Sequence, residues 1–282
     1  MIALALFFGV VLSLLVSVSL KDRLSKWVGP LLKINMIGLG FGLGAGDFAA
    51  IEPRYIGLVF LGAALTGSVG WILWRYLNIK SVVAGLIVVG TAICGGSAIA
   101  AVAPVVKAKT QDIVVALAAV FLLNSVAMVL FPMVGHMIGL PQSLFGIWAG
   151  IAIHDTSSVI GAAGLFGDAS LKIAVIIKAI RVLLIIPVVI GLSLYTTKKA
   201  SWRGMPWFLW LFIGAVLLNF EIASPIFPMI YLWSKKLIIL PIFLMGLSFS
   251  MADLRQAGVK PFVYAGILWL VVSASILGLI LI

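Results

Sequence analysis

The chain has 282 residues, of which 64% are apolar and only 10% are charged. Soluble domains are nearer to half apolar with about a quarter of their residues charged, so the composition excludes a soluble globular fold and a disordered chain. The net charge of +11 fits Lys and Arg in short loops beside anionic lipid better than it fits a nucleic-acid partner. We therefore expect an integral protein of the lipid bilayer.

Hydrophobic runs bounded by charged residues, Pro or Gly follow one another along the chain. They predict ten segments, at residues 2–20, 27–47, 55–74, 81–106, 113–138, 144–166, 173–195, 207–228, 237–252 and 261–282. A spanning helix needs roughly 20 residues, and continuous rather than alternating runs favour helices over membrane strands. The prediction is an all-α, polytopic membrane protein with about ten transmembrane helices, forming a single transporter domain over residues 1–282.

The basic residues are divided unequally between the loops. Ten Lys and Arg lie in loops after odd-numbered segments and six in loops after even-numbered segments. The positive-inside rule then places the odd-numbered loops in the cytoplasm and both termini outside. The N-terminal run lacks a basic region and a cleavage site, so we expect it to be a retained helix. The expected location is the inner (plasma) membrane of a bacterial-type cell.

One internal similarity relates the fourth and sixth segments. Residues 90–103 and 150–163 are identical at five of fourteen positions when compared at an offset of 60. This comparison aligns Cys94-Gly95-Gly96-Ser97 with His154-Asp155-Thr156-Ser157. Chance similarity between Gly- and Ala-rich helices is the alternative explanation.

A second similarity relates the two ends of the chain. Gly38-Leu39-Gly40-Phe41 matches Gly246-Leu247-Ser248-Phe249 at an offset of 208, and Asp47 and Asp253 follow. The helices that carry this pair would cross in opposite senses, as an inverted-topology repeat requires. The helices of the first pair would not, so the repeat boundaries stay open.

The segment at 81–106 contains a break signal at Cys94, Gly95, Gly96 and Ser97. Each glycine disfavours a helix by about 1 kcal/mol relative to alanine, and unwound backbone is tolerated inside a membrane only beside protein or a watery cavity. Amides at a new half-helix N-terminus form an anion site without a charged side chain. These four residues are candidates for substrate binding; close packing of small residues is the alternative.

The segment at 144–166 places His154, Asp155, Thr156 and Ser157 in an otherwise apolar run. A carboxylate there costs several kcal/mol unless it is paired or solvated, so it indicates an ion pathway by default. Imidazole also titrates near neutral pH. We expect His154 and Asp155 to carry the coupling ion and Thr156 and Ser157 to contact the anion. A structural polar plug is the alternative.

Lys178 and Arg181 lie three residues apart in the seventh segment, so they share one helical face. Arg181 is deep, and its planar fork suits a divalent oxyanion. It is therefore a further substrate-binding candidate, with a structural pairing to Asp155 or Glu221 as the alternative. Lys178, Glu221 and Asn124 are secondary candidates, and Asn124 suits interhelical hydrogen bonding equally well.

Several chemistries find no support in the sequence. It contains no Walker loop, no H-E-x-x-H motif and no G-x-S-x-G elbow, and Cys94 is the single cysteine. ATP-driven transport, a metal site and an enzymatic nucleophile are therefore not expected. We expect a protein that is not an enzyme and that uses no cofactor.

Three stretches carry a resemblance to a known family. They are GTAICGGSAIAAVAPVVKA (Gly90–Ala108), GHMIGLPQSLFGIWAGIAIHDTSSVIGAA (Gly135–Ala163) and KAIRVLLIIPVV (Lys178–Val189). The chain resembles the YeiH-type family of sulfate exporters from about Leu31 to Gly278. That resemblance implies a relation to the bile acid, arsenite and cation–proton antiporter transporters, whose cores contain inverted repeats and crossed, broken helices. The broken elements here would lie near Cys94–Ser97 and His154–Ser157.

Together these features predict a secondary active transporter that exports a small anion such as sulfate, an organic sulfonate or a carboxylate. It would work by alternating access, with H+ or Na+ as the coupling ion. Two alternatives remain open: a proton- or sodium-coupled cation antiporter that uses Asp155, and a passive anion channel. Nothing in the sequence decides whether the chain forms a homodimer.

Overall fold

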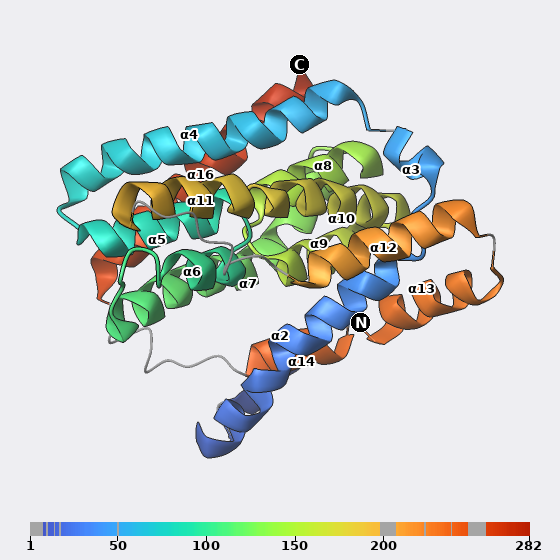
Figure 1. Ribbon diagram of the computed structural model, residues 1–282, viewed down its shortest axis with the longest axis horizontal. Helices are drawn as coiled ribbons and strands as arrows, with labels where there is room; N and C mark the ends of the chain where they lie inside the picture. Colours follow the sequence, from blue (N-terminus) through green and yellow to red (C-terminus); the bar gives the residue numbers. More distant parts are fainter. Residues whose placement is uncertain are drawn as a thin grey trace.

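The computed structural model describes residues 8–9, 11–13, 15–16, 18–49, 51–197, 207–222, 224–237, 239–247 and 258–282. These residues form helices joined by short connections and contain no strand (Figure 1). In chain order the helices are α2 (Val18–Gly40), α3 (Ala45–Ala49), α4 (Pro53–Leu77), α5 (Ser81–Ala92), α6 (Gly96–Val102), α7 (Thr110–Met137), α8 (Gln142–Ala152), α9 (Thr156–Phe166), α10 (Asp168–Leu183), α11 (Ile185–Thr197), α12 (Trp207–Glu221), α13 (Ile226–Leu237), α14 (Ile239–Leu247) and α16 (Val259–Leu281). The all-α class is therefore confirmed for the described chain.

Five helical stretches within the described residues are long and apolar enough to cross a membrane. They are Pro53–Leu77, Gln111–Met137, Asp168–Thr196, Ile226–Leu244 and Val259–Leu281. Shorter apolar helices accompany them, including α5, α8 and α9 of the two interrupted segments. The total of ten spans stays a prediction, because most of segment 2–20 and the end of segment 237–252 lie outside the described residues.

Two predicted segments are interrupted where glycine or polar residues occur. The segment at 81–106 consists of α5, which ends at Ala92, and α6, which begins at Gly96. The segment at 144–166 consists of α8, which ends at Ala152, and α9, which begins at Thr156. We call residues 93–95 and 153–155 the paired breaks.

Two predicted boundaries are wrong. The loop expected at residues 21–26 lies inside α2, which runs from Val18 to Gly40. The hydrophobic run at 207–228 predicts a single segment, but α12 ends at Glu221 and α13 begins at Ile226. Pro225 lies between them, and proline lacks the amide that a helix interior requires. The helix that follows continues from α13 toward α14, so the eighth and ninth segments are divided nearer to residue 225 than to residue 228.

The helices pack in two groups (Figure 1). The first, which we call the α2 group, comprises α2 and its neighbours α12, α13 and α14. The second, which we call the break group, comprises α4 to α11 and α16 and contains both paired breaks. The groups meet where α14 contacts α9, and α3, which belongs to neither group, contacts α10.

Glycines allow α8 and α10 to approach closely within the break group. A Cβ atom added at Gly146 would lie 2.7 Å from the Ser170 carbonyl oxygen, and one added at Gly150 would lie 2.7 Å from a methyl group of Ile177. Small residues four apart let helix backbones come together in the absence of a large apolar ridge. This packing brings the C-terminal half of α10 beside the paired breaks.

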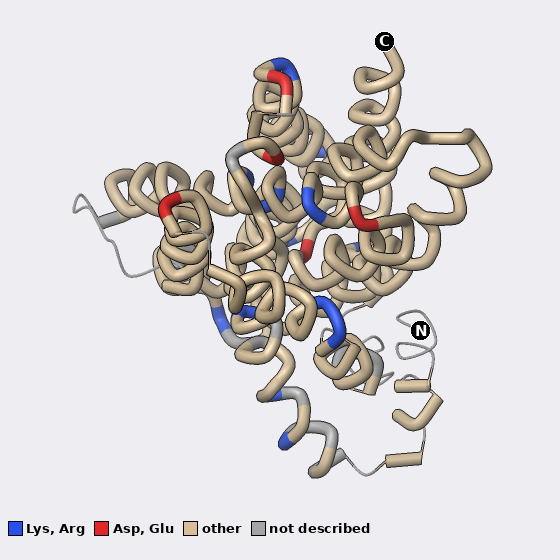
Figure 2. Tube along the Cα trace, turned by 90° about the vertical axis from the view of Figure 1, so that its right-hand side faces the viewer, with Lys and Arg blue, Asp and Glu red and all other residues tan. Residues whose placement is uncertain are grey.

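The core of the break group is α8, whose residues from Phe145 to Ala152 are all buried. The Trp148 ring stacks on Phe131 at a centroid distance of 4.1 Å, and its Nε1 donates to the Ser273 carbonyl at 3.0 Å. Large apolar side chains such as Phe60 and Leu270 are exposed, as expected of a surface that faces lipid. Charged residues form only short stretches of the trace (Figure 2).

Candidate functional site

The paired breaks lie directly against each other. A Cβ atom added at Gly95 would lie 3.2 Å from Asp155 Cβ and 3.4 Å from Asp155 Cα. Gly95 has φ +62° and ψ −124°, a conformation that only glycine adopts without strain. Glycine at this position therefore allows the backbone conformation of the first break and leaves room for the second break to pack against it.

The offset of 60 seen in the sequence corresponds to equivalent local structure. The first halves end at Ala92 and Ala152, and the second halves begin at Gly96 and Thr156. The polar residues that the sequence analysis aligned therefore occupy the same positions relative to two helix breaks. The inverted repeat itself stays a prediction, since Ser248, Phe249 and Asp253 of the second similarity lie outside the described residues.

Asp155 caps the N-terminus of α9. Its Oδ2 accepts a hydrogen bond from the Ser157 amide at 3.0 Å and another from the Ser157 hydroxyl. The Asp155 amide donates to Asn124 Oδ1 of α7 at 3.2 Å. A carboxylate is stabilised at the positive end of a helix. No Lys, Arg or His of the described chain forms an ion pair with Asp155.

The N-terminus of α6 has no comparable cap. Gly95 occupies the capping position without a side chain, and no acidic residue lies in the first turn. Cys94 is buried beside it, Gly96 packs against the Phe121 ring, and Ser97 is only partly buried. The positive end of this half-helix is therefore not neutralised by a carboxylate of its own.

Lys178 binds the carbonyl ends of both breaks. Its side chain is completely buried, and Nζ lies 3.2 Å from the Ile93 oxygen, 2.8 Å from the Ile153 oxygen and 2.5 Å from the His154 oxygen. An ammonium group has three donors, and all three have an acceptor here.

Arg181 binds the same ends one turn further along α10. Its Nε donates to the Ala92 carbonyl at 2.7 Å, Nη1 donates to the Ile153 carbonyl at 3.1 Å, and Nη2 donates to the Thr91 carbonyl. Carbonyls in the last turn of a helix lack intrahelical donors, and cations are favoured at this negative end. The side chain is buried and is directed at backbone rather than at an anion.

These contacts correct one expectation about the basic residues. The alternative that Arg181 pairs with Asp155 or Glu221 is wrong, because its partners are the carbonyls of Thr91, Ala92 and Ile153. Glu221, a secondary candidate from the sequence, is the last residue of α12 and is exposed. It lies in the α2 group rather than at the breaks.

Several buried polar atoms near the breaks have no hydrogen-bond partner. They are the two ring nitrogens of His154, Nδ2 of Asn124, Oγ of Ser158 and Oγ1 of Thr91. Buried polar groups are nearly always paired, and an unpaired group costs free energy. This set, with the carboxylate of Asp155, makes the breaks a candidate site for an ion or a small solute.

The structure brings together most of the residues expected from the sequence. Cys94 to Ser97, His154 to Ser157 and Asn124 meet at the breaks, and Lys178 and Arg181 support them from α10. The sequence analysis missed the carbonyls of Thr91, Ile93 and Ile153. Their signal was the break itself, because every helix that ends inside a membrane leaves carbonyls that need donors. Among the described residues, no three His, Cys, Asp or Glu are placed to hold a metal ion.

Comparison with known proteins identifies the family. The family model described as "Conserved hypothetical protein 698" matches residues 1–265. The chain is 38% identical to the UPF0324 membrane protein of Bdellovibrio bacteriovorus, over 99% of this chain and 89% of the relative. It is 38% identical to that of Vibrio vulnificus, over 98% and 91%, and 39% identical to that of Geobacter sulfurreducens, over 96% and 88%.

No solved structure matches the chain significantly. The names of the relatives state a membrane location, in agreement with the apolar helices of the structure. The family model covers nearly the whole chain, and the relatives are similar over nearly their whole length. Both findings assign the chain to one family. The chain belongs to the UPF0324 family of membrane proteins, the family of conserved hypothetical protein 698.

Proposed function

We propose that this chain is a secondary active transporter whose substrate and coupling ion bind at the paired breaks. The observation that carries the proposal is the contact between two interrupted helices at Gly95 and Asp155 inside a membrane protein. Interrupted helices whose ends face a common site are how many transporters bind solutes away from water. The unpartnered polar atoms of His154, Asn124 and Ser158 support the same location.

The charge at the breaks favours a small anion as substrate. Lys178 and Arg181 are both buried there, and Asp155 is the single carboxylate at the paired breaks. Each helix end carries about half an elementary charge, and the two carbonyl ends offset the two amide ends. The side chains therefore leave one positive charge in excess, which an anion neutralises.

In this proposal the anion binds at the uncapped start of α6, at Gly96 and Ser97, with Cys94, Thr156 and Ser157 beside it. Arg181 and Lys178 act indirectly, because they position the two breaks and supply the excess charge. Sulfate, an organic sulfonate and a carboxylate all suit such a site. The resemblance to YeiH-type sulfate exporters, and through them to the bile acid, arsenite and cation–proton antiporter transporters, supports sulfate, export and an inverted-repeat core.

Asp155 and His154 are the proposed coupling residues. Asp155 lies against Gly95, so its negative carboxylate repels an anion at the start of α6. A proton or Na+ bound to Asp155 therefore strengthens anion binding, and anion binding strengthens ion binding in return. The expected partners are thus a small anion, H+ or Na+ and the bilayer, with no cofactor and no catalytic step. The inner membrane is the proposed location.

The test is radiolabelled sulfate counterflow in proteoliposomes over a range of pH. The wild type is expected to show saturable counterflow that rises as pH falls. Asp155→Asn is expected to keep counterflow and lose this pH dependence, because the amide is neutral throughout. Asp112→Asn is the matched control, since Asp112 pairs with Lys80 away from the breaks. Unchanged transport and pH dependence in both Asp155→Asn and Arg181→Ala would refute the residue assignment.

A second candidate function has one observation in its favour. Asp155 lacks a basic partner among the described residues, as a cation-binding carboxylate would. A proton- or sodium-coupled cation antiporter would therefore also use it. Currents on a solid-supported membrane distinguish the two: charge movement on adding Na+ or changing pH, with none on adding anions, selects the antiporter. Saturable counterflow also separates a transporter from a passive anion channel.

A further inference from the structure

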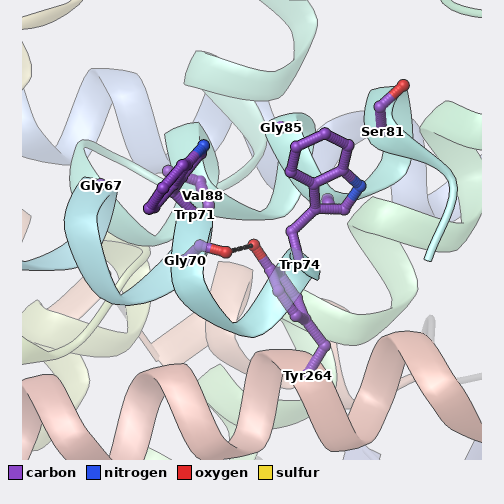
Figure 3. A pocket seen from close by; sticks show the side chains of 9 residues that line it. Gly67, Gly70, Trp71, Trp74, Ser81, Gly85, Val88 and Tyr264 are labelled. Atoms are coloured by element: carbon purple, nitrogen blue, oxygen red, sulfur yellow. Dashed lines mark hydrogen bonds between the residues drawn. The ribbon is translucent and has the colours of Figure 1, made fainter. Parts of the chain in front are cut away.

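A groove lies on the outside of the break group, away from the paired breaks. It has a volume of about 240 Å³ and lies between α4, α5 and α16 (Figure 3). Glycines and aromatic side chains line it, among them Gly67, Trp71 and Trp74 of α4, Gly85 of α5 and Tyr264 of α16. We call it the α4–α5 groove.

Two polar side chains of the groove are already hydrogen-bonded. The Tyr264 hydroxyl donates to the Gly70 carbonyl at 2.8 Å (Figure 3). Trp74 Nε1 donates to the Ile79 carbonyl at 3.0 Å. The surface offered to a ligand is therefore mainly aliphatic and aromatic carbon. Such a surface does not bind the small anion proposed for the breaks.

Two glycines open the groove. A Cβ atom added at Gly67 or at Gly85 would meet no atom within 4 Å, whereas one added at Gly70 would lie 2.3 Å from a Val88 methyl group. Gly70 thus serves the close packing of α4 on α5, and Gly67 and Gly85 face open space. The hollow results from missing side chains on two adjoining helices, which gives it room for a flexible apolar chain.

A free cation lies at the mouth of the groove. Trp74 also lines an adjoining hollow with Arg75, Asn78, Ile79 and Lys80. Lys80 is engaged by both carboxylate oxygens of Asp112, at 2.6 and 2.7 Å. Arg75 has no carboxylate partner in the described part of the chain.

Arg75 is held in place by aromatic rings. Its guanidinium carbon lies 4.9 Å from the Trp71 ring centroid and 5.9 Å from that of Trp74. A guanidinium over an aromatic face keeps its in-plane N–H groups available to a second partner. The two rings therefore orient a positive charge without neutralising it.

The order of these features along α4 matches a lipid. Arg75 lies two residues before the end of the helix, at Leu77, and Trp residues are typical of the membrane interface. Gly67 lies eight residues earlier, which is about 12 Å deeper along the helix axis. We infer that the α4–α5 groove binds an anionic phospholipid, with its phosphate on Arg75 and one acyl chain between Gly67 and Gly85.

A second copy of the chain fits this surface less well. In a twofold dimer about the membrane normal, equivalent residues lie at the same depth, so the groove would bring two Arg75 guanidinium groups toward each other. Like charges repel, and neither Arg75 would gain an acidic partner from its counterpart. A phosphate supplies that partner directly.

Native mass spectrometry of the full chain in detergent tests the inference with phosphatidylglycerol and phosphatidylcholine as probes. The wild type is expected to bind phosphatidylglycerol preferentially. Arg75→Gln is expected to weaken that binding about fivefold, the effect of one basic residue near a membrane surface, and to leave phosphatidylcholine unchanged. Lys236→Gln is the matched control, because Lys236 also lies over a tryptophan ring, Trp233, elsewhere in the molecule.

Filling the groove gives an independent readout. Gly85→Leu is expected to weaken binding of both lipids, whereas Gly57→Leu, at another open glycine of α4 outside the groove, is expected to leave both unchanged. Equal phosphatidylglycerol binding in wild type, Arg75→Gln and Gly85→Leu would overturn the inference. A dimer in the wild type that Gly85→Leu converts to monomer would overturn it in favour of a second copy. Sulfate counterflow does not enter either readout, so this result stands apart from the proposed function.

Discussion

The two interrupted helices end alike and resume differently. At both, the last carbonyls of the first half are bound by Lys178 and Arg181 of α10. At the second half, α9 starts with the carboxylate of Asp155, whereas α6 starts after Gly95 with no capping side chain. The comparison teaches that the same two cations, Lys178 and Arg181, bind carbonyls at both breaks. The negative charge of Asp155, in contrast, caps a helix at one break alone.

The largest expected effect on stability comes from replacing Arg181, which binds carbonyls at both breaks. Arg181→Met leaves the carbonyls of Thr91, Ala92 and Ile153 buried without this donor. Loss of one member of a buried charged network costs about 3 to 5 kcal/mol, so we expect a large fall in the melting temperature of the detergent-purified protein. Arg181→Lys, which keeps the charge and loses the fork, is the matched control and should fall between the two. Equal melting of Arg181→Met and wild type would contradict the support role.

The next largest effect on stability is expected at Gly95, in the break that lacks a carboxylate. Gly95→Ala places a methyl group 3.2 Å from Asp155 Cβ at a backbone conformation with φ +62°. Such strain costs about 1 to 3 kcal/mol. Gly57→Ala, at an open position of α4, is the control and should be neutral or slightly stabilising. Thermal unfolding of the two variants checks the difference, and a harmless Gly95→Ala would mean that the breaks do not need to touch.

A smaller effect on stability is expected at Asp155, where two variants distinguish the capping hydrogen bond of α9 from the negative charge. Asp155→Ala removes the acceptor for the Ser157 amide and is expected to cost about 1 kcal/mol. Asp155→Asn keeps a good capping group, so its stability should lie near the wild type while its charge is lost. The order of the three melting temperatures is the measurement. If Asn destabilises as much as Ala, the charge rather than the hydrogen bond stabilises this break.

The smallest effect on stability is expected at His154. Both ring nitrogens are buried without a partner, so an apolar replacement leaves no acceptor or donor unpaired. His154→Leu should change the free energy of unfolding by less than about 1 kcal/mol. A loss of sulfate counterflow in a variant of unchanged melting temperature would then assign His154 to transport; a strongly destabilised variant would assign it to the fold.

The two breaks were predicted on different grounds. Gly95-Gly96 weakens a helix by itself, so the first interruption has a local signal. The second was expected from the family resemblance, and Asp155 is a residue type preferred at a helix N-terminus. Composition predicted the membrane class. The split near Pro225 was missed because the apolar run continues on both sides of it.

The partners of the basic residues could not be predicted in this way. A search of the sequence for partners of Arg181 finds other charged side chains, such as Asp155 and Glu221. Its actual partners are main-chain carbonyls. A predicted break indicates that some carbonyls need donors, but every residue has a carbonyl, so the sequence does not say which of them Arg181 binds. Only the close packing of α10 on Gly146 and Gly150 of α8 decides which carbonyls Arg181 and Lys178 reach.

The reach of α10 to both breaks constrains how the molecule can move. Lys178 and Arg181 each bind carbonyls from α5 or its break and from the second break, so both breaks are held by one helix. In the proposed transporter they therefore move as one rigid unit. In the proposed transporter, relative movement then takes place at the seam, by which we mean the contacts between the break group and the rest of the chain. Two ion pairs at the start of α10 span that seam, Lys172 with Asp47 of α3 and Asp168 with Lys235 of α13. In the proposed transporter, movement of the break group against the rest of the chain requires these two ion pairs to break.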